Sequence, residues 1–251
     1  MKIYEYGDPD KPALLLIHGL SMIGNESFEP LLPLLTPHFR PLVINQDGHE
    51  PGIEGDFISL AESARQIEAY LLEHHNGACP YVYGLSMGAG VVLRMLWNNT
   101  IRFRHVIMDG AFVLNLGILS KPVSSMTAAL MTDLVHGKHN LGAKIPAMVL
   151  GVGDSQNHLK GMGSRISRTS INNAMYSLMS LRWEGEVNLT PVSFLYGSEE
   201  RQGSQALARR LKHQSLPSLQ ARCFEGYGHA GLLGSAPEKW AQKLVSQFID
   251  E

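Results

Sequence analysis

The stretch that decides the fold is YVYGLSMGAG, residues 81–90, where an apolar run leads through a glycine into a serine and a second glycine. Residues 81–83 predict a buried strand, and the segment from Met87 to about Asn98 predicts a helix that starts directly after it. The chain must then reverse at Ser86, which leaves this serine strained at the tip of the turn. We expect glycine at 84 and 88 because side chains two positions either side of the serine would collide.

The same turn predicts a chemical role for Ser86. The N-terminus of the following helix points at the serine oxygen, and its free N–H groups and dipole favour negative charge there. A G-x-S-x-G sequence alone arises by chance in a chain with 25 glycines. Its place between a strand and a helix makes it informative, so we predict that Ser86 is a nucleophile.

A histidine in a glycine-rich loop is the predicted partner. His229 lies in GYGHAG, residues 226–231, between the last predicted strand, Ala221–Phe224, and the last predicted helix. Such a loop lets an imidazole reach across the sheet edge toward a serine several strands away. An imidazole with a pKa near neutrality can take the serine proton and return it to a leaving group, so we predict His229 as general base.

The carboxylate that should orient the imidazole is less well defined. Glu200, three residues past the glycine that ends the strand Val192–Tyr196, is the first choice. Glu199 beside it and Asp109, directly after the strand His105–Met108, remain open alternatives.

A further loop, LIHGLS at residues 16–21, follows the early strand Ala13–Ile17 and suits an oxyanion hole. The backbone N–H groups of Leu20 and Met87 are predicted to hold the developing negative charge. His18 itself is expected to brace the loop by hydrogen bonding.

Short apolar runs alternate with helix-period segments along most of the chain, which predicts an α/β fold with a mostly parallel sheet flanked by helices. The remaining strand candidate is Pro41–Asn45, and Lys2–Tyr6 suits an antiparallel edge strand. Helix starts are predicted at Ser59, at Ser204 and at Ser235 from their capping signatures.

Residues 111–189 break this alternation. They contain six of the eleven methionines and no confident strand pair, while helical pieces are predicted near Ser124–Val135 and Ser167–Leu181. We expect residues 1–110 and 190–251 to form the core and residues 111–189 to form a helical cap. The methionines of the cap suit simple core filling, and their position there leaves an adaptable apolar acyl pocket as the alternative.

Composition excludes several classes of protein. The 251 residues carry a net charge of −2, which argues against a nucleic-acid or anionic-membrane partner. No run suits a signal peptide or a membrane span, and the two cysteines, Cys79 and Cys223, suit reduced thiols, so we predict a soluble cytoplasmic protein, monomeric or homodimeric. His136 and His139 lack acidic partners, and no metal or cofactor is expected.

Together, the His18-Gly19 loop, the turn at Ser86 and Gly228-His229, in the order nucleophile, acid, histidine, resemble the α/β-hydrolase superfamily. The resemblance spans Tyr4 to about Asp250 apart from the cap. It implies an eight-stranded, mostly parallel sheet and chemistry without a cofactor.

The predicted function is hydrolysis of a carboxylic ester or thioester of a small apolar molecule, through an acyl-enzyme on Ser86. Two alternatives remain open. One is acyl transfer to another acceptor, or C–C bond cleavage, by the same serine. The other is a binding protein on this fold without turnover, which would retain ligand affinity when Ser86 is replaced.

Overall fold

A computed structural model describes residues 1–50, 55–135, 166–182 and 186–249. One sheet runs through this part of the chain in the strand order β1-β3-β2-β4-β5-β6-β7. β1 pairs antiparallel with β3, and every other pairing is parallel. The strands are β1 (Lys2–Glu5), β2 (Ala13–Ile17), β3 (Arg40–Asn45), β4 (Tyr81–Leu85), β5 (His105–Asp109), β6 (Val192–Gly197) and β7 (Leu219–Phe224).

All seven predicted strands, including the antiparallel edge strand, are confirmed to within two residues at each end. The count of eight that the resemblance implied is corrected to seven for the described residues. The continuous apolar runs have a simple cause, which β2 illustrates. Leu15 and Ile17 pack into one core and Leu14 and Leu16 into the other, so this strand is buried on both faces.

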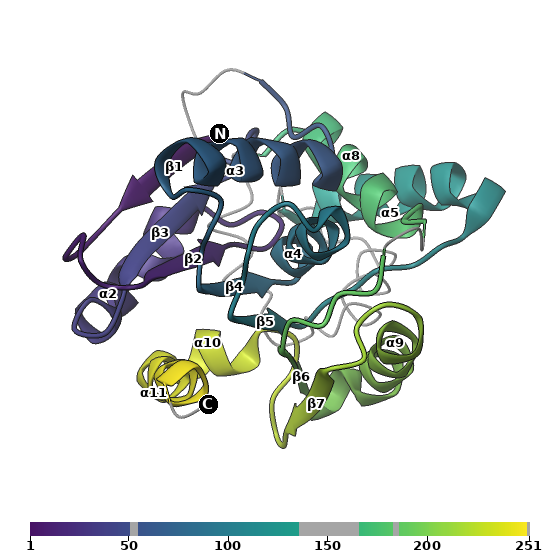
Figure 1. The fold of residues 1–251 in the computed structure, drawn as a ribbon. Coiled ribbons are helices and arrows are strands. Elements are labelled where there is room, and N and C mark those ends of the chain that lie inside the picture. The colour runs from purple at the N-terminus through teal and green to yellow at the C-terminus, as the bar shows by residue number, and fades with distance from the viewer. Residues whose placement is uncertain (51–54, 136–165, 183–185, 250–251) are drawn as a thin grey trace.

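Helices cover both faces of the sheet, as Figure 1 shows. One core is completed by side chains from α3 (Leu60–His74), α4 (Met87–Asn98) and α9 (Arg201–Gln214). The other is completed by α1 (Gly24–Phe28), α2 (Leu32–Leu35), α10 (Gly231–Ser235) and α11 (Pro237–Ile249), with the short 3₁₀ turn η1 (Glu29–Leu31) between α1 and α2. Among the described residues, no helix is both long and apolar enough to cross a bilayer.

Of the predicted helix starts, the one at Ser59 is confirmed and those at Ser204 and Ser235 are wrong. Ser59 caps α3 as expected, because its hydroxyl accepts a hydrogen bond from the Glu62 N–H. The prediction at Ser204 is wrong. α9 begins at Arg201, directly after the 3₁₀ turn η5 (Ser198–Glu200), so Ser204 lies within its first turn. The prediction at Ser235 is also wrong, since this serine ends α10 and its hydroxyl donates to Gly231 O.

Between β5 and β6, the described residues include the 3₁₀ turn η2 (Gly117–Leu119) and the longer helices α5 (Ser120–Val135) and α8 (Arg168–Met179), which confirms both helical pieces predicted there. The two long helices pack against each other, and Ser120 Oγ donates a hydrogen bond of 2.7 Å to Met179 O. α8 also contacts the core, since Leu178 lies close to Gly90 in α4. The assignment of residues 111–189 to a separate cap stays a prediction.

Candidate active site

Ser86 is the single residue between β4 and α4, with φ 53° and ψ −111°. A positive φ is costly for a residue with a side chain, so the reversal predicted from sequence is present and strained. The surrounding structure holds it, because Ser86 N–H donates a 2.7 Å hydrogen bond to Asp109 O at the end of the neighbouring strand.

The two flanking glycines are required for different reasons. A Cβ on Gly84 would lie 2.7 Å from Gly88 O, which is the collision across the turn that the sequence predicted. A Cβ on Gly88 would instead lie 2.3 Å from Ile17 O in β2. The second glycine therefore permits close contact between α4 and the adjacent strand rather than relief within the turn.

His229 bridges the serine and a carboxylate. Its Nε2 lies 2.9 Å from Ser86 Oγ, and its Nδ1 lies 2.9 Å from Glu200 Oε2. A proton on Nδ1 donates to the carboxylate, which leaves Nε2 free to accept the serine hydroxyl proton. The side chains of His229 and Glu200 are only 10% and 15% exposed, so this chain of hydrogen bonds is largely shielded from solvent.

Of the three candidate carboxylates, the structure places Glu200 against the imidazole. The turn η5 directs its side chain back toward β6, where Oε1 accepts a hydrogen bond from Gly197 N at 3.2 Å. Glu199 is exposed on the same turn. Asp109 is buried and accepts a 2.7 Å hydrogen bond from the Tyr83 hydroxyl instead.

Asp109 nevertheless lies within electrostatic range of the site. Its pKa is raised to about 6, chiefly by burial; the Tyr83 hydroxyl opposes the shift and the neighbouring Glu200 carboxylate adds to it. A carboxyl in these surroundings favours its neutral form more than an exposed one.

The loop after β2 lies against the serine, as an oxyanion hole requires. A Cβ on Gly19 would lie 3.3 Å from Ser86 Cβ. Within the described residues, neither the Leu20 N–H nor the Met87 N–H donates a hydrogen bond to the protein. The role of these two amides as oxyanion donors stays a prediction.

His18 braces this loop, as the sequence suggested. Its Nδ1 lies 2.8 Å from Gly19 O, and its Nε2 accepts the Gln46 N–H at 3.1 Å. Burial and, to a lesser degree, the nearby His49 ring lower the pKa of His18 to about 3. The ring therefore stays neutral at physiological pH and serves as a fixed hydrogen-bonding strut.

Three residues near the site were missed by sequence reasoning: Tyr83, Gln46 and Gly110. Gln46 holds His18 through its N–H and through Nε2, which donates to His18 O at 3.0 Å. Gly110 has φ +57° and lies against the His229 ring. An Asp-Gly pair directly after a strand could have signalled Gly110, whereas the other two sit in ordinary strand or loop sequence.

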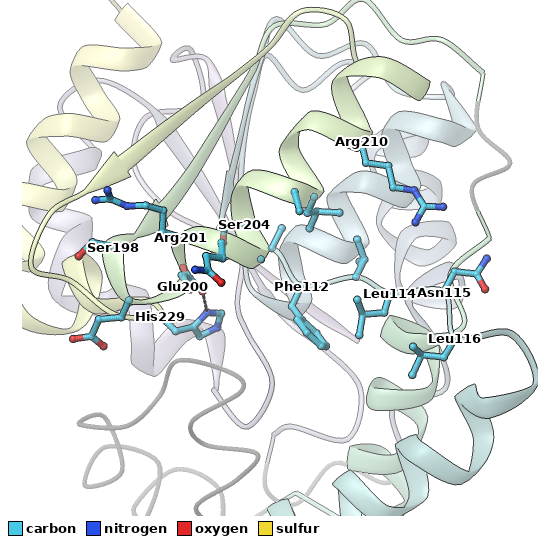
Figure 2. A pocket seen from close by; sticks show the side chains of 17 residues that line it. Phe112, Leu114, Asn115, Leu116, Ser198, Glu200, Arg201, Ser204, Arg210 and His229 are labelled. Carbon is cyan, nitrogen blue, oxygen red and sulfur yellow. Dashed lines mark hydrogen bonds and ion pairs between the residues drawn. The ribbon is translucent and has the colours of Figure 1, made fainter.

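A cavity of about 730 Å³ opens beside the imidazole, between the segment that follows β5 and the first turns of α9. Figure 2 shows His229 and Glu200 at one end, Phe112 and Leu114 further along, and Arg210 at the far end. His136 and His139, considered as metal ligands, lie outside the described residues.

Comparison with known proteins agrees with the observed fold. The sequence profile of the Alpha/beta hydrolase family matches residues 14–243. The chain therefore belongs to the α/β hydrolase family, whose fold and sheet topology it shows. A search of curated protein sequences found no significant match.

Solved structures with the same fold cover nearly the whole chain. An α/β hydrolase family protein from Desulfitobacterium hafniense has a TM-score of 0.86 at 22% identity, covering 98% of this chain and 99% of its own. MenH from S. aureus has a TM-score of 0.75 at 13% identity, and the match covers 99% of this chain and 97% of that protein. An esterase from Exiguobacterium antarcticum has a TM-score of 0.71 at 17% identity, and the match covers 98% of this chain and 94% of that protein. At these identities the likeness establishes the shared fold.

Proposed function

We propose that this protein is a serine hydrolase that cleaves a carboxylic ester or thioester through an acyl-enzyme on Ser86. The observation that carries the proposal is the hydrogen-bonded chain from Ser86 Oγ through His229 to Glu200, with both bonds to the imidazole 2.9 Å long. Membership of the α/β hydrolase family supports hydrolase chemistry.

In the first step, Ser86 Oγ attacks the substrate carbonyl carbon while its proton passes to Nε2 of His229. The Glu200 carboxylate stabilises the imidazolium that forms, because Nδ1–H donates to it. The carbonyl oxygen becomes an oxyanion, which the Leu20 and Met87 amides stabilise. Each such donor contributes roughly 10²–10³-fold to the rate.

In the second step, the bond between the carbonyl carbon and the leaving oxygen or sulfur breaks, and the imidazolium at His229 protonates the departing group. A water molecule then gives its proton to Nε2 and attacks the acyl carbon, which releases the acid and restores Ser86. Esters and thioesters are favoured over amides because their leaving groups need less assistance. We propose that residues 111–189 act as a cap that shapes the substrate site.

The test combines covalent labelling with turnover. The wild-type protein is expected to react with a fluorophosphonate probe and to hydrolyse p-nitrophenyl or acyl-CoA esters from a series of graded acyl length. Ser86→Ala should abolish both. Turnover that survives Ser86→Ala, or a wild-type protein that binds esters without labelling or hydrolysis, would overturn the proposal, and the latter would favour a binding protein on this fold.

A further inference from the structure

We propose that the cavity between residues 111–116 and α9 receives the alcohol half of the ester, and that this half is bulky and uncharged. The inference rests on the proposed hydrolase function and specifies its substrate class. Only part of the candidate active site lines this cavity. His229 and Glu200 do so, whereas Ser86, Leu20 and Met87 are not among its described lining residues.

The chemistry of the leaving group connects this cavity to one half of the substrate. The leaving oxygen takes its proton from Nε2 of His229, so it must come within hydrogen-bond distance of that atom. The carbonyl oxygen must simultaneously lie near the Leu20 and Met87 amides. The substituent on the leaving oxygen therefore extends on the imidazole side, where this cavity opens.

The size of the cavity indicates a large group. Its volume of about 730 Å³ lies within the range of pockets that enclose a drug-sized ligand. Methanol or ethanol would leave most of this space to water, so a small alcohol would gain little binding energy from the walls.

The lining indicates the chemistry of that group. One wall, the segment after β5, is mainly apolar, and Phe112, Leu114 and Leu116 contribute to it. Its backbone is tied to α8, because Leu114 N–H donates to Leu178 O at 2.7 Å and Leu116 N–H donates to Met179 O at 3.0 Å. A wall fixed in this way presents a preformed apolar surface.

The opposite wall comes from η5 and α9 and is mainly polar, although Ala206 and Leu207 also contribute to it. Among the described residues, the charged side chains that line the cavity are two acids and two bases, namely Glu199, Glu200, Arg201 and Arg210. Glu200 is bound to His229, and Arg201 is paired with Glu225. This formal balance favours neither a cationic nor an anionic alcohol, so the fitting group is uncharged, with an apolar side facing Phe112.

Two substitutions on α9 test the inference in opposite directions. Ala206 is exposed and lines the cavity, so Ala206→Trp should fill space without disturbing the core. Leu207→Ala should enlarge the same space. Lys212→Trp is the matched control, because Lys212 is exposed on the same helix and does not line the cavity.

The readout is the ratio of kcat/KM for a bulky-alcohol ester to that for a methyl ester of the same short acid. Ala206→Trp should lower this ratio by about tenfold. Leu207→Ala should raise it for the bulkiest alcohols, and Lys212→Trp should leave it unchanged. A second series with a constant alcohol and graded acyl length should show the same length preference in all variants.

Two outcomes would overturn the inference while the proposed function stands. A change confined to the acyl series would show that the cavity holds the acyl half, and unchanged ratios in both series would place it outside the substrate path. If the wild-type protein hydrolyses neither an ester of either series nor an acyl-CoA thioester, the proposed function itself fails and the inference falls with it.

Discussion

Gly110 lies directly against the imidazole of His229, so closely that no side chain fits between them. A Cβ on Gly110 would lie 2.8 Å from Cε1 and 2.9 Å from Nδ1 of His229. Gly110 follows β5, whereas His229 lies in the loop after β7. The glycine therefore defines one side of the slot in which the proposed general base sits between Ser86 and Glu200.

Gly110→Ala is expected to displace the imidazole and to lower kcat/KM roughly 10²-fold, because small misplacements of a reacting group cost that much. Ester hydrolysis and circular dichroism would measure activity and folding together. Gly117→Ala is the matched control, since Gly117 has φ +55° but nothing within 4 Å of an added Cβ. Equal losses in both variants would show that backbone strain alone, and not contact with His229, is responsible.

Glu200→Gln should lower kcat roughly 10²–10⁴-fold with little change in fold, because the amide cannot stabilise the imidazolium as the carboxylate does. Steady-state kinetics on one ester would rank this variant against two others. Glu199→Gln should have little effect, since Glu199 is exposed, and Asp109→Asn should cost much less than Glu200→Gln. The reverse ranking, with Asp109→Asn the most damaging, would reassign the acid.

Asp109 should make the folded state less stable as pH rises. Its pKa rises from 3.8 to about 6 in the folded protein, chiefly through burial, so the folded state holds the proton more tightly than the unfolded state. The free energy of unfolding therefore falls as pH increases between these two values, and this group causes no further fall above them. Asp109→Asn should remove this contribution, about 2–3 kcal/mol.

Urea unfolding of both proteins at pH 4 and pH 7.5 would measure the effect. Asparagine can still accept the Tyr83 hydroxyl, so the hydrogen bond is retained. The free energy of unfolding of Asp109→Asn minus that of wild type should be larger at pH 7.5 than at pH 4. A difference between the two proteins that does not change with pH would show that Asp109 titrates normally.

The sequence alone determined the features that depend on residues near each other along the chain. The strand, the glycines and the helix around Ser86 predicted the turn, and the glycine-rich loop at 226–231 predicted the reach of His229. The strands themselves were readable because burial on both faces leaves continuous apolar runs such as Ala13–Ile17.

Only the tertiary structure decided which distant groups meet. It placed Glu200, not Glu199 or Asp109, against His229, since η5 directs that side chain inward. It also showed that Gly88 is needed for contact with β2 and that Gly110 makes room for the imidazole. These contacts depend on strand order and on how segments far apart in sequence approach one another, which local patterns do not encode.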